Sequence, residues 1–447
     1  MLTLRSENTK NLSGDIQLPG DKSISHRALI FGTLAKGETV VRGLLEGDDV
    51  MSTRSALVQL GGQIDLLDDD GDRRWRVQGL GLGGFTSPEA PLDLGNSGTG
   101  ARLLMGVIAG SGISAVFTGD ASLSKRPMAR VTDPLKEMGA TVEARDGTYL
   151  PLTISAPDQP QAMTYESPVA SAQVKSAILL AGLTARGNTS VTEPKASRDH
   201  TEAMLRHFGA EVESTFHDDG RYTATLSGQA QLTARDVDVP ADPSSAAFLT
   251  VAALITPGSH LTLKAVGTNP LRFGVFETLM EMGADITLSN QRQEGGEDVA
   301  DLTVKTSALK GITVPAERAA SMIDEYPILS IAAAHASGTT TMIGVEELRV
   351  KETDRIQLMA DGLVAAGVAV ETTHDSMTVT GKGGAAITGG ITVDACHDHR
   401  IAMSFLTLGL ITSQAMTVSG AETIATSFPN FTDLMRQIGG NINVVSA

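Results

Sequence analysis

Residues 349–359, RVKETDRIQLM, place cations beside a group that could transfer a proton. Lys351, Glu352 and Arg355 lie together at the predicted start of a helix. A lysine next to a glutamate offers a proton donor and a proton acceptor, and the arginine could hold an anion beside them. The alternative is a solvated charged turn, which is the commoner setting for such a run. The stretch is therefore a candidate acid–base site that depends on what surrounds it.

A second cationic stretch, GDKSISHRA at 20–28, comes directly before an apolar segment predicted to be a buried helix. Helix N-termini attract anions through unsatisfied amides and partial positive charge. Small polar residues also begin apolar segments at 96–99, 171–173 and 243–245. The cations near these starts are Lys22, Arg27, Arg102, Lys125, Arg126, Lys175, Arg198, Lys351, Arg355 and Arg400. We predict that they bind a multiply anionic substrate, although each start taken alone could be an ordinary N-cap.

Three further motifs carry weaker chemical signals. Asp324 in DEYP (324–327) could be a base or a helix N-cap, and the helix dipole at such a position weakens a carboxylate as a base. CHDHR (396–400) offers possible metal ligands, but the sequence has no second Cys/His group with zinc spacing, so we predict no metal site. GLGLGG (79–84) is not followed by a predicted helix, which argues against a dinucleotide site.

Six repeats along the chain must position these residues. A helical segment that ends in glycine and leads into a strand recurs as LGGQI (60–64), MGATV (138–142), FGAEV (208–212), MGADI (282–286), AGVAV (366–370) and IGGNI (438–442). Upstream of each copy lies a segment that is apolar nearly all round, which predicts a helix buried on every side. Buried helices require sheets on the outside. The predicted fold class is therefore α/β: a two-domain inside-out α/β barrel with three β-α-β-α-β-β repeats per domain.

Proline-containing segments separate the repeats into two groups of three. We predict one domain at 22–240, a second at 1–21 with 241–447, and hinges near 18–22 and 239–245. The first 18 residues are predicted to form a strand that pairs with the second domain. Helix starts that share one orientation would then line a cleft between the domains. The acidic stretch 65–79 is predicted to be a solvated hairpin.

Composition narrows the class of partner. The chain has 447 residues, a net charge of −17 and 4% aromatic residues, which argues against nucleic acid and anionic membranes. We found no transmembrane or secretory segment, and Cys396 is the single cysteine, so a reducing cytoplasm is expected. We expect a monomer that acts on small molecules.

Long motifs extend the analysis from residues to a family. LPGDKSISHRA, LGNSGTGARL, TGDASLSKRPM, SAQVKSAILLAGL, SRDHTEAML, DEYPI, RVKETDRI, DHRIAM and ATSFPNF occur in this order. The chain resembles the 5-enolpyruvylshikimate-3-phosphate synthases from end to end. The resemblance implies transfer of the enolpyruvyl group of phosphoenolpyruvate to the 5-hydroxyl of shikimate 3-phosphate, by addition and elimination, in the pathway to aromatic amino acids. It also implies that phosphate is released without a metal or organic cofactor.

The resemblance implies roles for particular residues. For shikimate 3-phosphate it implies Lys22, Ser23, Arg27, Ser171, Ala172, Gln173, Arg198, Asp324 and Lys351. For phosphoenolpyruvate it implies Lys22, Asn96, Gly98, Thr99, Arg126, Gln173, Arg355 and Arg400. Asp324 would take the hydroxyl proton, and Glu352 with Lys22 would protonate the methylene carbon. Domain closure about Pro19 and Pro240 would complete the site.

Departures from the family pattern resemble its second bacterial class. Many relatives have lysine where this chain has Thr426, asparagine at His26 and serine at Ala172. Which cation replaces the missing lysine stays open. Gly98 predicts sensitivity to glyphosate, because insensitive members of that class have alanine there.

Three rival functions fit the sequence less well. The related transferase that acts on UDP-N-acetylglucosamine commonly uses a cysteine in its second repeat, whereas Cys396 lies in the sixth. An RNA-terminal-phosphate enzyme is opposed by the acidic charge and the few aromatic residues. A non-catalytic anion-binding module would not need Lys22, Asp324, Glu352 and Arg355 together.

Overall fold

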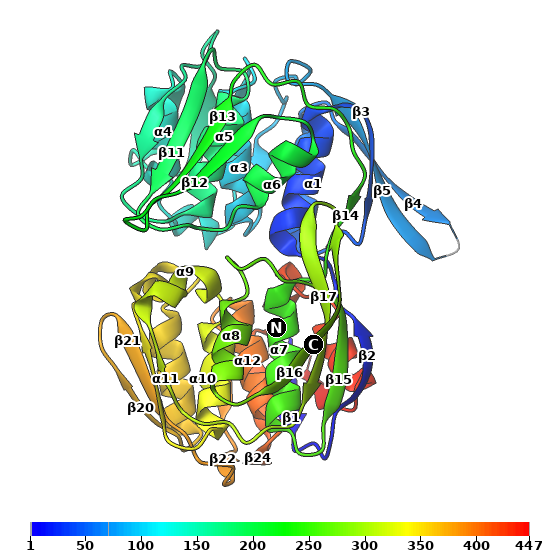
Figure 1. The fold of residues 1–447 in the computed structure, drawn as a ribbon, viewed down its shortest axis with the longest axis vertical. Helices are drawn as coiled ribbons and strands as arrows, with labels where there is room; N and C mark the ends of the chain where they lie inside the picture. The colour runs from blue at the N-terminus through cyan, green and yellow to red at the C-terminus, as the bar shows by residue number, and fades with distance from the viewer. Residues whose placement is uncertain (1, 70, 447) are drawn as a thin grey trace. The chain divides into compact units, whose positions relative to one another are not determined.

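A computed structural model describes residues 2–69 and 71–446 (Figure 1). The chain forms two compact units. Unit 1 holds the chain up to Pro19, Pro240–Gln293 and the chain from Asp298 onward, and unit 2 holds Gly20–Val239 with Glu294–Glu297. The chain changes unit after Pro19 and after Val239, within the two proline-containing segments whose role as hinges stays a prediction, and again at both ends of Glu294–Glu297. Glu294–Glu297 lies in unit 2, although the sequence analysis grouped it with the C-terminal half.

The sheets of unit 2 repeat one topology. In the sheet β6–β7–β9–β8, the edge strand β6 is parallel to β7, and β9 is antiparallel to both β7 and β8. The sheets β10–β11–β13–β12 and β14–β3–β5–β4 have the same order of directions. The hairpin of β4 and β5 is the one predicted from the acidic stretch. The strands are β3 (Lys36–Arg42), β4 (Gln63–Asp69), β5 (Asp72–Leu80), β6 (Leu92–Asp93), β7 (Ser114–Thr118), β8 (Thr141–Arg145), β9 (Tyr149–Ser155), β10 (Thr164–Glu166), β11 (Asn188–Glu193), β12 (Val212–Phe216), β13 (Tyr222–Ser227) and β14 (Val237–Asp238).

Unit 1 repeats this topology in β16–β17–β15–β2, β18–β19–β21–β20 and β23–β25–β1–β26. In the last of these sheets the N-terminal strand β1 pairs with both β25 and β26, whereas β2 pairs with β15. The predicted pairing with the second domain is confirmed, but the first 18 residues form two strands and not one. The strands are β1 (Thr3–Glu7), β2 (Ser13–Gln17), β15 (His260–Gly267), β16 (Asp285–Glu294), β17 (Glu297–Lys305), β18 (Thr313–Val314), β19 (Thr339–Ile343), β20 (Ala369–Thr372), β21 (Ser376–Thr380), β22 (Ile387–Gly389), β23 (Thr392–Asp394), β24 (Thr412–Gln414), β25 (Met416–Ser419) and β26 (Asn441–Ser446).

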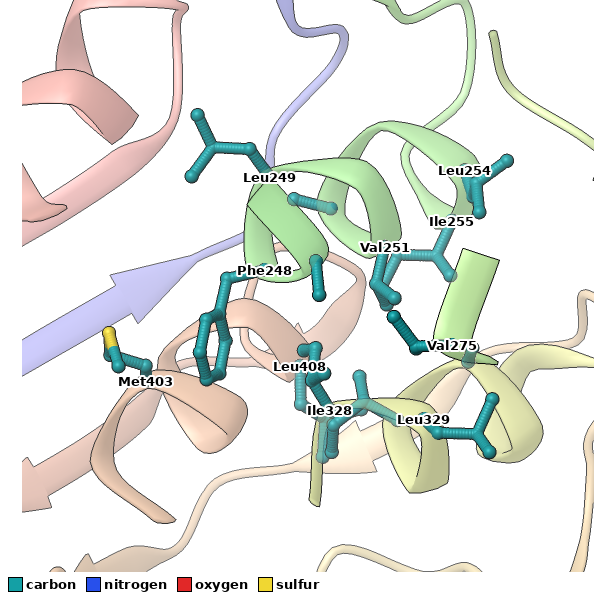
Figure 2. Packing of buried hydrophobic residues seen from close by; sticks show 14 of the residues in the cluster. Phe248, Leu249, Val251, Leu254, Ile255, Val275, Ile328, Leu329, Met403 and Leu408 are labelled. Atoms are coloured by element: carbon teal, nitrogen blue, oxygen red, sulfur yellow. The ribbon is translucent and has the colours of Figure 1, made fainter. Parts of the chain in front are cut away.

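The first helix of each repeat lies inside its unit, where most of its residues are buried (Figure 1). These core helices are α1 (Lys22–Leu34), α3 (Gly98–Ala109), α5 (Ala172–Gly182), α7 (Pro243–Ile255), α10 (Tyr326–His335) and α12 (His399–Leu408). Every residue of α7 is buried. Figure 2 shows Phe248 of α7 beside Met403 of α12, and Leu408 of α12 next to Ile328 of α10. The predicted arrangement, with helices inside and sheets outside, is confirmed.

The second helix of each repeat ends at the predicted glycine. These helices are α2 (Asp48–Gln59), α4 (Ala129–Glu137), α6 (His200–His207), α8 (Gly274–Glu281), α11 (Arg355–Ala365) and α13 (Phe431–Gln437), and the short helix α9 spans Ala319–Met322. The glycines at 61, 139, 209, 283, 367 and 439 all have φ between 92° and 102°. Residues with a side chain rarely adopt this conformation, so the repeated glycine is required by the turn. No helix in the described part of the chain has the length and apolar character needed to cross a bilayer.

Candidate active site

In unit 2 the core helices α1, α3 and α5 begin at side-chain caps. Asp21 accepts a hydrogen bond from the amide of Ile24 at 2.9 Å, and Ser97 accepts one from Gly100 at 3.1 Å. Ser171 caps α5 in the same way. These caps satisfy part of each first turn. At α1 and α3 the cap lies next to the predicted anion-binding residues, whereas at α5 the cap, Ser171, is itself one of them. At α1 the cap is Asp21, one residue before Lys22.

Side-chain hydrogen bonds join these helix starts to one another. Gln173 of α5 donates through Nε2 to Oγ1 of Thr99 on α3 at 3.0 Å and accepts from Nη1 of Arg102 at 2.7 Å. Arg27 of α1 donates through Nη2 to Oγ of Ser176 on α5 at 2.9 Å. The structure thus connects the first turns of all three helices, which the sequence analysis had assigned to two different substrates.

Arg126 lies against the start of α3. Its Nη2 donates to Oδ1 of Asn96 at 2.7 Å, and Nδ2 of Asn96 donates to Oδ2 of Asp120 at 2.7 Å. A Cβ atom added to Gly98 would lie 3.1 Å from Nη1 of Arg126. The guanidinium is therefore fixed beside a glycine with no side chain between them. Sequence reasoning missed Asp120, whose only signal was its place within the motif TGDASLSKRPM.

Lys22 forms an ion pair with Asp49, a buried residue in the first turn of α2. Sequence analysis missed Asp49 as well, because a pair of aspartates after a glycine looks like an ordinary helix start. The pair fixes the position of the ammonium group and partly compensates its charge.

Arg27 is buried, with Nε donating to Oγ1 of Thr201 at 2.6 Å and Nη1 donating to the carbonyl of Ser23 at 3.0 Å. Burial lowers the pKa of Arg27 to about 10, against the opposing effect of the Glu202 carboxylate. The guanidinium stays protonated at neutral pH, so α1 carries a buried positive charge near its N-terminal end.

Lys175 does not belong with the predicted anion-binding cations. It is fully buried and forms ion pairs with Glu193 at 3.0 Å and Glu202 at 2.9 Å. Its ammonium also lies 4.6 Å from the centre of the Tyr222 ring. Burial lowers its pKa, but the two carboxylates outweigh burial and the net pKa is raised. Its positive charge is therefore paired with buried carboxylates and does not face a substrate anion.

In unit 1, Arg355 stands at the centre of a group of carboxylates. Nε donates to Oδ2 of Asp398 at 2.8 Å, Nη1 to Oδ1 of Asp324 at 3.2 Å, and Nη2 to Oε2 of Glu352 at 2.5 Å. Nη2 also donates to Oδ1 of Asp398 at 3.3 Å. Burial lowers the pKa of Arg355, yet the three carboxylates raise it above its ordinary value. The predicted acid–base pair and the predicted anion ligand thus form one cluster rather than a solvated turn.

Asp324 is not a helix cap, which corrects one of the two interpretations of DEYP. Helix α10 begins at Tyr326, with Glu325 at the cap position. The Asp324 carboxylate instead lies 3.2 Å from Arg355 and 3.7 Å from the ammonium of Lys351. Its backbone carbonyl accepts from Nη1 of Arg400 at 2.9 Å. Two cations therefore face the carboxylate that the family resemblance assigns as the base.

Asp398 connects this cluster to helix α12. It caps the helix by accepting from the amide of Arg400 at 2.9 Å, and Thr353 donates to its Oδ2 at 3.1 Å. Sequence analysis gave Asp398 no role beyond its place in the motifs CHDHR and DHRIAM. In that motif the structure shows Cys396 and His397 in a turn with φ of 49° and 64°, and not in a strand. No group of three or more His, Cys, Asp or Glu within residues 2–69 and 71–446 could hold a metal ion.

Two other predicted positions have internal partners. Ser244, at the start of α7, hydrogen-bonds to the carboxylate of Glu325 and accepts from Arg272 at 2.9 Å. Thr426, where many relatives have lysine, lies 3.4 Å from Nδ1 of His399 and donates to the carbonyl of Thr423. The side chain next to Thr426 is therefore an imidazole, one residue before Arg400.

The fold is one that an enolpyruvyl transferase of known structure shares. The enolpyruvyl transferase NikO from Streptomyces tendae has the same fold, with a TM-score of 0.77 at 18% identity over 100% of this chain and 99% of that chain. The profile of EPSP synthase (3-phosphoshikimate 1-carboxyvinyltransferase) matches residues 6–435, and the chain belongs to this family. The predicted family is confirmed, and the chain is a carboxyvinyl transferase of the shikimate pathway.

Individual relatives are similar over nearly their whole length. The 3-phosphoshikimate 1-carboxyvinyltransferase of Paracoccus denitrificans is 55% identical over 99% of this chain and 98% of its own, and that of Rhodospirillum rubrum is 54% identical over 99% and 98%. The EPSP synthase of Acinetobacter baumannii has a TM-score of 0.88 at 45% identity over 100% of both chains.

Proposed function

We propose that this chain transfers the carboxyvinyl group of phosphoenolpyruvate to the 5-hydroxyl of shikimate 3-phosphate, with the side chains described above in defined roles. The observation that carries these roles is the Arg355 cluster, in which one buried guanidinium holds Asp324 and Glu352 with their carboxylates on a common centre. Addition and elimination need a base for the hydroxyl and an acid for the methylene carbon, and this cluster supplies two carboxylates.

Shikimate 3-phosphate is proposed to bind to the starts of α1 and α5. Lys22 and Arg27 supply positive charge, and Ser23 and Arg198 lie next to helix starts on the same unit. The proposed ligands on α5 are Ser171, Ala172 and Gln173. Backbone amides and hydroxyls at a helix start suit a phosphate, because they combine hydrogen-bond donors with the positive end of the dipole.

Phosphoenolpyruvate is proposed to bind at the start of α3, against Gly98 and Thr99. Arg126 is fixed there by Asn96, and a guanidinium matches a phosphate or a carboxylate with paired donors. From unit 1, Arg400 and Arg355 complete the proposed ligands. Four of the five N–H groups of Arg355 already bind carboxylates, which leaves one on Nη1 for the substrate.

The proposed proton transfers follow from this arrangement. The oxygen of the 5-hydroxyl bonds to C2 of phosphoenolpyruvate while its proton passes to the Asp324 carboxylate. Glu352, which enters this step in its protonated form, donates a proton to C3 together with Lys22. Loss of one proton from that methyl group and cleavage of the C2–O bond to phosphate then give the enol ether. Lys351 and Arg355 face Asp324, so they stabilise the negative charge that the hydroxyl oxygen develops.

We also propose that the chain acts as a monomer in the cytoplasm. A single cysteine, Cys396, suits a reducing compartment. Light scattering of the purified protein tests the monomer, because a dimer would double the mass of 46.6 kDa.

Phosphate release by the purified protein tests the reaction. We expect phosphate release only when shikimate 3-phosphate and phosphoenolpyruvate are both present, and none when UDP-N-acetylglucosamine replaces the shikimate compound. Release without an acceptor, or with the nucleotide sugar, would overturn the proposal. Absence of release with tight binding of both compounds would instead support the anion-binding module.

The variant Asp324→Asn tests the proposed base. We expect kcat to fall by about 10² to 10⁴-fold, the usual contribution of a general base. The matched control is Asp361→Asn, at an exposed position of α11 where the carboxylate accepts only a hydrogen bond from Gln357. Equal activity of the two variants would remove Asp324 from the mechanism.

A further inference from the structure

We propose that Glu193 is a positioning residue for the phosphate-binding part of the shikimate 3-phosphate site. Glu193 is the last residue of β11 and is 1% exposed. It has no role in the reaction proposed above and does not itself face a substrate. This inference rests on the proposed function, because it takes Ser171 and Arg198 as ligands of the substrate phosphate.

One carboxylate oxygen of Glu193 fixes the start of α5. Oε1 accepts the backbone N–H of Ser171 at 2.6 Å. Ser171 in turn caps α5 through its hydroxyl, which accepts the amide of Val174. The carboxylate therefore fixes the position of the first turn of α5, where the phosphate is proposed to bind.

The same carboxylate fixes the loop that carries Arg198. The hydroxyl of Ser197 lies 2.8 Å from both carboxylate oxygens, and its backbone N–H donates to Oε2 at 3.3 Å. Ser197 directly precedes Arg198, so four residues of loop fold back onto the side chain of Glu193. A single group thus sets the spacing between Ser171 and Arg198.

The buried Lys175 makes this arrangement possible. A carboxylate without compensation would not stay ionised in a dry interior, and a protonated one could not accept all of these hydrogen bonds. Oε2 of Glu193 lies 3.0 Å from the ammonium of Lys175, which also pairs with Glu202. Lys175 additionally donates to the carbonyl of Ser197 at 3.3 Å, so it holds the same loop.

Glu202 offers a matched comparison. It pairs with the same lysine and is equally buried, but its other hydrogen bond comes from the hydroxyl of Tyr222 at 3.1 Å. The two substitutions Glu193→Gln and Glu202→Gln therefore remove the same charge from the same ion-pair cluster. Only Glu193→Gln disturbs Ser171 and Ser197. Each carboxylate oxygen of Glu193 accepts from a backbone N–H of one of these residues, and the glutamine NH2 group that replaces one oxygen can only donate.

Steady-state kinetics of the two variants test the proposal. For Glu193→Gln we expect the KM for shikimate 3-phosphate to rise at least tenfold, with the KM for phosphoenolpyruvate and kcat changed less than threefold. With shikimate as acceptor, which lacks the phosphate, we expect kcat/KM to equal that of the parent within threefold. Glu202→Gln is expected to show the parent's KM for shikimate 3-phosphate within twofold.

Two results would overturn the proposal: an equal rise in KM for both variants, or an equal loss of kcat/KM with shikimate and with shikimate 3-phosphate. If Glu193→Gln does not fold, Ser197→Ala decides the question. It removes the hydrogen bond that the hydroxyl shares between the two carboxylate oxygens, and a KM for shikimate 3-phosphate unchanged from the parent would then refute the inference. A parent enzyme that releases no phosphate would contradict the proposed function itself, which is a different result.

Discussion

Replacing Asp398 by asparagine tests how much the Arg355 cluster contributes to the stability of unit 1. Asp398 is fully buried and accepts two hydrogen bonds from Arg355, at 2.8 and 3.3 Å. It also caps α12. Asparagine has nearly the same shape and caps helices as well as aspartate does, so the cap is retained while the charge and one acceptor oxygen are lost.

The expected loss follows from the number of partners that remain. Breaking a buried ion pair by removing one partner costs about 3–5 kcal/mol. Arg355 keeps Asp324 and Glu352, so we expect the lower end, about 3 kcal/mol in the free energy of unfolding. For a unit of this size that corresponds to a fall in melting temperature of roughly 6–12 °C. Asp398→Ala should cost about 1 kcal/mol more, because the cap is then lost too.

Calorimetry and urea unfolding of both variants provide the measurement. The matched control is Asp354→Asn, which changes the N-cap of the neighbouring helix α11 in the same way. Asp354 also pairs with an arginine, Arg349, at 2.7 Å, but its side chain is 39% exposed. Exposed pairs contribute about 0–1 kcal/mol, so this control should lose less than 1 kcal/mol. Equal losses in the free energy of unfolding for Asp398→Asn and Asp354→Asn would refute the reasoning that burial makes the Arg355 ion pairs contribute more to stability than an exposed pair does.

Three further predictions concern unit 2. Burial, with the nearby cations Lys22 and Arg27, lowers the pKa of His26 well below its ordinary value. The unfolded chain therefore binds a proton that the folded chain does not, so stability should fall as pH drops below about 6.5, by up to about 1.4 kcal/mol per pH unit. Urea midpoints at pH 7 and 5.5 should show a weaker pH dependence in His26→Asn, and an unchanged dependence would contradict this. The parent should be inhibited by glyphosate in competition with phosphoenolpyruvate. Gly98→Ala puts a methyl group 3.1 Å from Arg126 and should raise both the inhibition constant and the KM for phosphoenolpyruvate several-fold. A parent that glyphosate does not inhibit would refute this prediction. Lys175→Met leaves two buried carboxylates uncompensated and should cost about 3–5 kcal/mol in urea unfolding, and a loss below 1 kcal/mol would show that the cluster is not ionised.

The architecture could be predicted because the same two local sequence signals occur in every repeat. A helix that is apolar on all sides must be buried, and a glycine after an amphipathic segment ends a helix. Both signals recur six times in the sequence, and the structure shows the same backbone conformation at all six glycines. The pairing of the N-terminal segment with the second domain was also predicted, and β1 pairs with both β25 and β26.

The partners of the site residues could not be predicted in the same way. Lys22 pairs with Asp49, and Arg355 pairs with Asp398, 43 positions away. Neither aspartate differs from an ordinary helix-start residue in the sequence, and their pairing depends on how separate repeats pack together. Lys175 shows the opposite case: the sequence places it beside a predicted binding residue, but the helix turns it toward the interior.

These pairings change the physical account of how the chain attracts anions. The sequence suggested an excess of local positive charge at the helix starts. The structure instead surrounds Arg355 with three carboxylates and pairs Lys22 with one, so neither cation contributes an uncompensated positive charge. The carboxylates instead orient the cations: each cation is held in a fixed position, and few of its N–H groups remain available to a substrate. Two mutually repelling substrates gain more from such fixed donors than from a diffuse field, because the donors need no reorganisation when charge moves during the reaction. Removing a buried carboxylate from either cluster should then weaken catalysis, even though it makes the site more positive.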